Sequence, residues 1–427
     1  MSFNSISVIG LGYIGLPAAA MFASKGKKVI GLDVDQYAVD TVNAGKIHIV
    51  EPELEVMVKK AVDEGLLKAT ISPEPADAFL IAVPTPFLPA KNKDSIPEPD
   101  LSYIEAAAKS IAGVLKKGDL VVLESTSPVG ATEQMSLWLS EERLDLTFPH
   151  SHGENSDIRI AYCPERVLPG QVIKELVNND RVIGGLTDKC SQAAIQLYRI
   201  FVDGDCVATN SRTAEMVKLT ENASRDVGIA FANELSMICD KINVDVWELI
   251  RLANRHPRVE ILSPGPGVGG HCIAVDPWFI ISQVDAESKL MHAARQVNEY
   301  KPKWVVKKVK AALTEFLLSN PDKTADHVTV ACFGLAYKPD IDDLRESPAL
   351  EITRELASLN TVRVLVVEPN ISKLPESIEE DVKLVSIPDA IKKADICVLL
   401  VDHSEFKVVS RDYFFGITLI DTRGIWI

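Results

Sequence analysis

The chain has 427 residues, of which 47% are hydrophobic, and it carries a formal net charge of -15. This length predicts two or three domains with sizeable cores, and the charge argues against binding to nucleic acid or to an acidic membrane. The seven cysteines show no C-x-x-C spacing, which favours a reducing compartment over a disulfide framework or a zinc knuckle. With no signal peptide expected and no apolar run of membrane-spanning length, we expect a cytoplasmic protein.

An apolar strand and a helix flank the first motif, GLGYIG, whose glycines are Gly10, Gly12 and Gly15. The next strand ends in Asp33, about 20 residues further on, which is the spacing of a Rossmann turn. In such a turn the glycines let the backbone approach a pyrophosphate, and the acidic residue accepts hydrogen bonds from the ribose. Because no Lys or Arg in 34–39 could bind a 2′-phosphate, the predicted cofactor is NAD rather than NADP.

Two further strands of the parallel type end in polar residues. The strand at 78–83 is followed by Thr85, and the strand at 119–124 is followed by Thr126. Ligands in open α/β sheets bind at the carboxyl ends of strands, so both threonines are candidate cofactor contacts. Taken alone, each could equally be a helix cap or a turn residue.

A strand at 159–162 leads into Glu165 and Arg166, which by themselves could form a surface ion pair. His150 and His152 precede this strand, but no third ligand lies near them in the sequence. A polar loop is therefore favoured over a metal site, and no metal is expected.

A long helical pattern covers 210–239 and carries a polar stripe. The stripe, at positions i, i+4 and i+7, consists of Lys218, Asn222 and Arg225. Its residues share one face of the helix, where they form either a solvated surface or part of a site. A second basic group contains His256 and Arg258 and could bind phosphate or sugar, or be a solvated turn.

The stretch 263–278, SPGPGVGGHCIAVDPW, combines four glycines with one cysteine. Asp276 and Pro277 fit the N-cap and the first position of a helix, so Cys272 is expected in a loop just before a helix N-terminus. Backbone N–H groups there favour a thiolate, which is the nucleophilic form of cysteine. The glycines would let the backbone come close to a sugar at Cys272. The alternative is a buried structural cysteine in a tight turn.

Residues 277–317 are predicted to be largely helical, and the alternation of strands and helices restarts near residue 327. This second α/β domain lacks G-x-G-x-x-G, so it does not imply a second NAD. Lys338, Arg345 and Arg423 lie at its predicted strand ends or loops, where a phosphate-bearing ligand could be held.

The predicted fold class is α/β, with three parts. These are an N-terminal Rossmann NAD-binding domain at 1–205, a central helical region at 206–315 with the Lys and Cys, and a C-terminal Rossmann-like α/β domain at 316–427.

An NAD site, a loop cysteine and a Lys/Asn stripe could together oxidise a primary alcohol by four electrons. The aldehyde formed first would be captured by Cys272 as a thiohemiacetal, and a second hydride transfer would give a thioester that water hydrolyses to a carboxylate. Lys218 and Asn222 would stabilise the alkoxide or oxyanion.

Eight motifs carry a resemblance to a known family. They are GLGYIGLP (10–17), STSPVG (125–130), CPERVLPG (163–170), AEMVKLTEN (214–222), NRHPRV (254–259), PGPGVGGHC (264–272), AYKPDIDDLRESPA (336–349) and DTRG (421–424). With them, the chain resembles the UDP-glucose/GDP-mannose dehydrogenase superfamily over essentially its whole length.

The resemblance implies roles for the matching residues. Cys272 would carry the thioester, Lys218 would donate or accept a proton with Asn222 beside it, and Glu165 and Asp276 would serve water activation and site support. The implied NAD contacts are Gly10, Gly12, Tyr13, Ile14, Gly15, Asp33, Thr85, Thr126 and Arg345. The implied sugar-nucleotide contacts are Arg166, Val167, Lys218, Asn222, Arg225, His256, Arg258, Gly269, Tyr337, Lys338 and Arg423.

Three positions depart from the UDP-glucose branch of the family. Pro169 stands where that branch has a glutamate, Val275 stands where it has a lysine, and Cys163 stands where it has an asparagine. They favour the branch that oxidises UDP-N-acetyl-D-mannosamine at C6 to the mannosaminuronate for surface polysaccharide synthesis. The alternatives are UDP-N-acetylglucosamine, UDP-glucose or GDP-mannose as substrate, or a non-catalytic NAD-binding scaffold with a structural cysteine. The resemblance also implies a homodimer formed through the central helices.

Overall fold

The computed structural model describes residues 3–49, 51–89, 92, 95–167, 170–270, 272–359, 361–378, 380 and 382–426. These residues form two compact units. The first comprises Met1–Glu221 and Trp278–Gln283, and the second comprises Asn222–Pro277 and Val284–Ile427. The domain boundaries expected after residues 205 and 315 stay predictions.

Within the described residues, the first unit contains an eight-stranded sheet of order β3-β2-β1-β4-β5-β6-β7-β8. The strands are β1 (Ser5–Ile9), β2 (Lys28–Leu32), β3 (Leu67–Thr70), β4 (Ala78–Ile81), β5 (Leu120–Leu123), β6 (Arg159–Tyr162), β7 (Arg181–Gly185) and β8 (Cys206–Asn210). All neighbours run parallel except β6 and β7, which pair antiparallel. The strand order reverses between β1 and β4, which is where open α/β sheets bind ligands.

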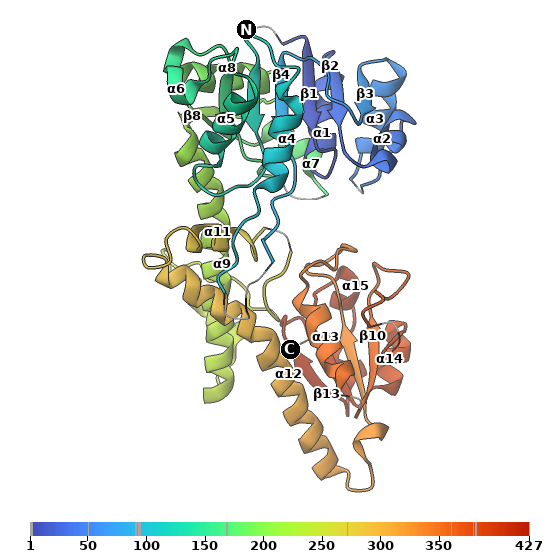
Figure 1. Ribbon diagram of the computed structural model, residues 1–427. Helices are drawn as coiled ribbons and strands as arrows, with labels where there is room; N and C mark the ends of the chain where they lie inside the picture. Colours follow the sequence, from blue (N-terminus) through green and yellow to red (C-terminus); the bar gives the residue numbers. More distant parts are fainter. Residues whose placement is uncertain are drawn as a thin grey trace. The chain divides into compact units, whose positions relative to one another are not determined.

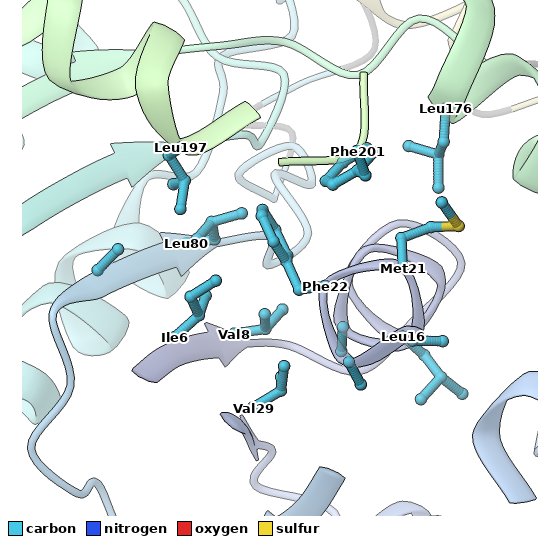
Figure 2. Packing of buried hydrophobic residues seen from close by; sticks show 14 of the residues in the cluster. Ile6, Val8, Leu16, Met21, Phe22, Val29, Leu80, Leu176, Leu197 and Phe201 are labelled. Atoms are coloured by element: carbon cyan, nitrogen blue, oxygen red, sulfur yellow. The ribbon is translucent and has the colours of Figure 1, made fainter. Parts of the chain in front are cut away.

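The apolar strands of this sheet are buried in two cores, to which helices of the first unit contribute. In chain order, the helices between β1 and β8 are α1 (Gly15–Ser24), α2 (Gln36–Asn43), α3 (Leu54–Asp63), α4 (Ser102–Ala112), α5 (Ala131–Glu142), α6 (Pro149–His152), η1 (Gly153–Asn155), α7 (Val172–Asn178) and α8 (Asp188–Tyr198). Figure 2 shows Phe22 of α1 packed beside Leu80 and Val8 of the sheet. The Phe22 ring meets the ring of Phe201 edge to face, with centroids 4.8 Å apart.

The central helices are α9 (Ser211–Ile242), α10 (Val246–Ala253), α11 (Asp276–Ile281) and α12 (Lys289–Ser319). Asn210 Oδ1 accepts the N–H of Thr213 at 2.9 Å and so caps α9. The helix expected over 277–317 is interrupted between α11 and α12. Asp276, expected as an N-cap, is instead the first residue of α11. No helix among the described residues is long and apolar enough to cross a membrane.

The second unit contains a parallel sheet of order β11-β10-β9-β12-β13. Its elements are η2 (Ala325–His327), β9 (Thr329–Phe333), α13 (Pro348–Ser358), β10 (Arg363–Val367), β11 (Val382–Leu384), α14 (Ile387–Lys393), β12 (Ile396–Leu399), α15 (Ser404–Lys407), η3 (Arg411–Phe414) and β13 (Thr418–Asp421). Buried side chains of α12 and α13 belong to one apolar core of this unit, and those of α14 and α15 belong to another. Figure 1 shows the ribbons of α13 and α14 beside the strands of this sheet. The predicted α/β fold class, with its N-terminal Rossmann domain, is confirmed.

Candidate active site

The predicted NAD turn has the geometry that a dinucleotide requires. Gly10 has φ +90°, and a Cβ there would lie 2.6 Å from the carbonyl oxygen of Ala82. A Cβ on Gly15 would lie 1.8 Å from the carbonyl oxygen of Gly10, so α1 can approach β1 only through a glycine. No atom of the described residues lies within 4 Å of a Cβ placed on Gly12, so the space next to its backbone is open. These three roles match those of the dinucleotide-binding glycines.

Asp33 helps to fix this turn, because its Oδ2 accepts the N–H of Leu11 at 2.7 Å. The carboxylate is only half-buried, and each of its oxygens retains a lone pair for a ribose hydroxyl. The strand-end threonines meet across the sheet, since Thr85 Oγ1 donates to the carbonyl oxygen of Thr126 at 2.6 Å. Tyr13, 39% exposed, lies in the turn that precedes α1.

Glu165 does not form the surface pair with Arg166 that the sequence allowed. The antiparallel register pairs Tyr162, the last residue of β6, with Gly184 of β7. Glu165 follows β6 by three residues, and Arg181 is the first residue of β7. Their buried side chains form an ion pair at 3.0 Å. The other oxygen of Glu165 accepts the backbone N–H of Arg166 at 2.6 Å.

The ion pair belongs to a buried polar cluster that sequence reasoning missed. The guanidinium of Arg181 lies over the ring of Tyr198, 5.1 Å from the centroid, and the Tyr198 hydroxyl donates to Glu124 Oε1 at 2.5 Å. Glu124 follows β5 and is 3% exposed. Burial in the first place, and then the charge of Glu165, raise the pKa of Glu124 to about 7.

Cys163 lies in the same cluster, where burial raises the pKa of its thiol to about 12. It is therefore a neutral thiol and a poor nucleophile at neutral pH.

Arg166 is held on the first turns of α9. Its guanidinium pairs with Glu221 at 2.6 Å, and Glu221 follows Lys218 by three residues on the same helix face. Lys218 is half-buried. Val167 packs against the core of the first sheet. The structure thus brings Arg166 to the stretch of α9 that carries the predicted lysine.

Cys272 differs in exposure from the other cysteines of the chain. All seven cysteines lie within the described residues and none is in a disulfide; five are buried, Cys206 is half-buried and Cys272 is exposed. The carbonyl oxygen of Cys272 accepts the N–H groups of Val275 and Asp276 at 3.1 and 2.9 Å, which closes a turn into α11. The exposed thiol argues against the alternative of a buried structural cysteine.

The side chains of Asn222 and Asp276 meet beside this turn. Asn222 Nδ2 donates a short hydrogen bond to Asp276 Oδ2, and Asp276 is 3% exposed. The predicted stripe of α9 therefore reaches the residue that closes the cysteine turn.

The two glycines just before Cys272 pack closely against the protein, and their predicted role toward a sugar stays a prediction. A Cβ on Gly269 would lie 2.4 Å from the carbonyl oxygen of Glu346, and a Cβ on Gly270 would lie 2.7 Å from the ring of Tyr337. The loop thus needs these two glycines to pack against the residues that follow β9. This packing places the predicted sugar-nucleotide residue Tyr337 against the loop that bears Cys272.

Arg423 and Asn233 hold the start of the same loop. The guanidinium of Arg423 pairs with Asp402 at 2.7 Å and lies close to Gly265. Asn233 Oδ1 accepts the N–H of Gly265 at 2.9 Å, and Asn233 Nδ2 donates to Asn298 at 2.9 Å. A buried amide on α9 thereby joins the loop to α12, a contact with no signal in the local sequence.

Other predicted residues have simpler surroundings. Arg345 pairs with Asp343 at 2.6 Å in the second unit. Arg225, His256 and Arg258 are exposed. Their predicted roles stay predictions. Pro169, expected to mark a branch difference, and His271 of the glycine motif lie outside the described residues.

Among the described residues, no group of three or more His, Cys, Asp or Glu side chains could hold a metal ion.

Comparison with known proteins matches the chain in three segments. In the UDP-glucose/GDP-mannose dehydrogenase family, the NAD binding domain matches residues 4–202, the central domain 212–300 and the UDP binding domain 331–426. UDP-N-acetyl-D-mannosamine dehydrogenase of Yersinia pestis is 62% identical, with all of both chains covered. NDP-N-acetyl-D-galactosaminuronic acid dehydrogenase of Ralstonia solanacearum is 60% identical, covering 100% of this chain and 97% of the other.

Among solved structures, the UDP-D-ManNAc dehydrogenase of Pyrococcus horikoshii is similar to the chain. Its TM-score is 0.84 at 38% sequence identity, covering 99% of this chain and 96% of the other.

Glu124 predicts a pH dependence of stability. Because its pKa is raised to about 7, the folded protein binds this proton more tightly than the unfolded chain does. The stabilisation is complete below the ordinary glutamate pKa and is lost as the pH rises through 7. Between pH 5 and pH 8 we expect the free energy of unfolding to fall by up to ~3 kcal/mol from this group. Urea denaturation at several pH values should show that Glu124→Gln flattens the decline.

The matched control is Glu55→Gln, at an exposed glutamate of α3. It should leave the pH dependence of unfolding unchanged. Equal slopes for wild type and Glu124→Gln would contradict the prediction.

Proposed function

Because the chain belongs to the UDP-glucose/GDP-mannose dehydrogenase family, we propose that it oxidises UDP-N-acetyl-D-mannosamine to UDP-N-acetyl-D-mannosaminuronate. The observation that carries the proposal is the exposed Cys272, held in a turn that Asp276 closes and Asn222 contacts. The choice of sugar is supported by the similarity over the full length to proteins named for this substrate.

The proposed reaction removes four electrons from C6 and leaves no free aldehyde. NAD bound at the turn of Gly10, Gly12 and Gly15 would supply the hydride acceptor for both oxidations, one NAD after the other. The Cys272 thiolate adds to the aldehyde carbon, which gives a thiohemiacetal, and loss of the second hydride gives a thioester. Water then cleaves the C–S bond, releasing the carboxylate and restoring the thiol.

Lys218 and Asn222 are proposed to stabilise the oxygen that becomes negative when the alcohol loses its proton and when the thiolate adds. Asp276 accepts a hydrogen bond from the Asn222 amide, which orients that amide and its carbonyl. Glu165 is proposed for water activation. Its oxygens already accept from Arg181 and from the Arg166 N–H, and the second lone pair of each oxygen is left for water.

The binding residues are proposed in two sets. NAD would be held by the turn of Gly10, Gly12, Tyr13, Ile14 and Gly15, and by Asp33, Thr85, Thr126 and Arg345. The sugar nucleotide would be held by Arg166, Val167, Lys218, Asn222, Arg225, His256, Arg258, Gly269, Tyr337, Lys338 and Arg423. The proposed role of the glycine turn in binding NAD is supported by the open space next to the backbone of Gly12 and by the half-buried carboxylate of Asp33.

A cytoplasmic location and a product used for surface polysaccharide synthesis complete the proposal. The location is supported by seven cysteines without a disulfide.

A homodimer through the central helices is supported by an apolar stripe on α9. Phe231, Ile238 and Ile242 are 52%, 48% and 61% exposed, and their spacing of seven and four residues places them on one helix face. Exposed apolar side chains gathered in this way are typical of an interface.

The substrate can be tested by comparing kcat/KM for five sugar nucleotides. We expect kcat/KM for UDP-N-acetyl-D-mannosamine to be about tenfold or more above the kcat/KM for each of the other four. These are its N-acetylglucosamine and N-acetylgalactosamine analogues, UDP-glucose and GDP-mannose. The galactosamine analogue belongs in the set because of the name of the Ralstonia relative. Two NADH should form for each sugar consumed. Higher activity on another sugar would reassign the substrate, and absence of turnover on all five would favour the NAD-binding scaffold.

Cys272→Ser should abolish carboxylate formation, because a serine hydroxyl is far less nucleophilic than a thiolate. We expect kcat to fall by about 1000-fold or more, with the Kd for NAD unchanged. Stopped assays for the uronate and calorimetric NAD titrations would measure the two effects. Cys206→Ser, at a half-buried cysteine of the first unit, is the matched control and should retain activity. Full turnover in Cys272→Ser would overturn the mechanism.

Phe231→Glu combined with Ile238→Glu should give a monomer, because two carboxylates would be placed in the proposed apolar interface. Size-exclusion chromatography with light scattering measures the mass directly. Val408→Glu, at an apolar residue of the second unit that is 84% exposed, is the control and should remain dimeric. A monomeric wild type, or a dimeric double variant, would exclude an interface on this stripe.

A further inference from the structure

The first turn of the second sheet repeats the backbone geometry of the first. Gly10 follows β1 with φ +90°, and its N–H donates to the carbonyl oxygen of Leu32 at 2.8 Å. Gly334 follows β9 with φ +96°, and its N–H donates to the carbonyl oxygen of Val367 at 2.8 Å. In both sheets the strand that accepts this bond is followed directly by a carboxylate residue, which is Asp33 in the first and Glu368 in the second.

The two carboxylates differ in what surrounds them. Asp33 is half-buried and accepts one backbone N–H on each oxygen. Glu368 is 4% exposed, and its Oε2 accepts the N–H groups of Leu335 and Ala336 at 2.7 and 3.1 Å. Its Oε1 accepts from the backbone and the side chain of Asn370 at 3.0 and 3.2 Å. At equivalent positions of the two sheets, the carboxylate of Glu368 is therefore surrounded by protein donors, whereas the carboxylate of Asp33 has room for a ribose hydroxyl.

A fully buried histidine supplies a further donor to Glu368. His403 Nε2 lies 3.0 Å from Glu368 Oε2, and His403 Nδ1 lies 3.0 Å from the backbone nitrogen of Asp340. A backbone N–H can only donate, so Nδ1 is the acceptor and Nε2 carries the proton that is donated to Glu368. Burial alone would raise the pKa of Glu368, but the hydrogen bonds from His403 and from the N–H of Leu335 hold it below its ordinary value.

These contacts fix both ends of one short loop, residues 335–340. Its first two N–H groups bind Glu368, and its last residue, Asp340, binds His403. Asp340 has φ +61°, a conformation that costs a non-glycine residue about 1 kcal/mol. Its carboxylate holds that conformation by accepting from the N–H and the hydroxyl of Ser404 at 2.8 and 2.7 Å.

Tyr337 and Lys338 lie between the two fixed ends. We propose that Glu368 and His403 are positioning residues that hold the 335–340 loop, so that Tyr337 and Lys338 are preorganised for the uridine diphosphate portion of the substrate. The inference rests on the proposed function, because it assumes that this loop binds the nucleotide. A loop that is already held loses less entropy when the nucleotide binds. Releasing the loop should therefore weaken binding of the nucleotide before it lowers kcat.

The test is binding of UDP alone, measured by calorimetry on the full chain. His403→Ala removes both the acceptor for Asp340 and the donor to Glu368. We expect the Kd for UDP and the KM for the sugar nucleotide to rise about tenfold or more, with the Kd for NAD unchanged. His403→Gln should restore most of the UDP affinity that His403→Ala loses. The glutamine amide can accept from the N–H of Asp340 and donate to Glu368 at the same time. His327→Ala, at an exposed histidine of the same unit, should behave as wild type.

A second variant covers the case in which His403→Ala does not fold. Asp340→Gly removes the bonds to Ser404 but suits the positive φ, so the protein should keep its thermal stability while UDP binding weakens several-fold. If wild type binds UDP and both Asp340→Gly and a folded His403→Ala bind it equally well, the inference is wrong. If wild type itself does not bind UDP, the proposed function fails instead.

Discussion

The hydrogen bond from Asn222 to Asp276 is the constraint on which the surroundings of Cys272 depend. Asn222 lies within α9, and Asp276 both begins α11 and closes the turn on the carbonyl oxygen of Cys272. Asp276 is buried, so its carboxylate needs hydrogen-bond donors in the interior, and the Asn222 amide is one of them. This side-chain contact joins the turn that bears Cys272 to α9.

Features with a local cause could be predicted from the sequence. The Rossmann turn is specified by glycines and an acidic residue within about 20 positions. Helix α10 likewise has a local cause, because Asp245 caps it by accepting the N–H of Trp247 at 2.8 Å. The break between α11 and α12 was missed, because the helical pattern continues through residues that the fold places in a turn.

Features caused by tertiary contacts could not be predicted in this way. The sequence does not predict that Gly269 and Gly270 pack against the carbonyl of Glu346 and the ring of Tyr337, which are far away in the chain. The ion-pair partner of Glu165 could not be predicted from the sequence either. Arg181 reaches it only because β7 turns back antiparallel to β6, a register that single-strand patterns do not encode.

The two glycine turns show why a motif alone does not define a nucleotide site. Gly10 and Gly334 share their backbone conformation and their hydrogen bond to the neighbouring strand, and each has an acidic residue at the end of that strand. What separates them is whether protein donors already use the lone pairs of that acid. Asp33 keeps an exposed edge, whereas Glu368 is covered by backbone N–H groups and by His403. With the same backbone turn, the acidic residue of the first sheet stays partly open to solvent, whereas that of the second sheet binds its own loop.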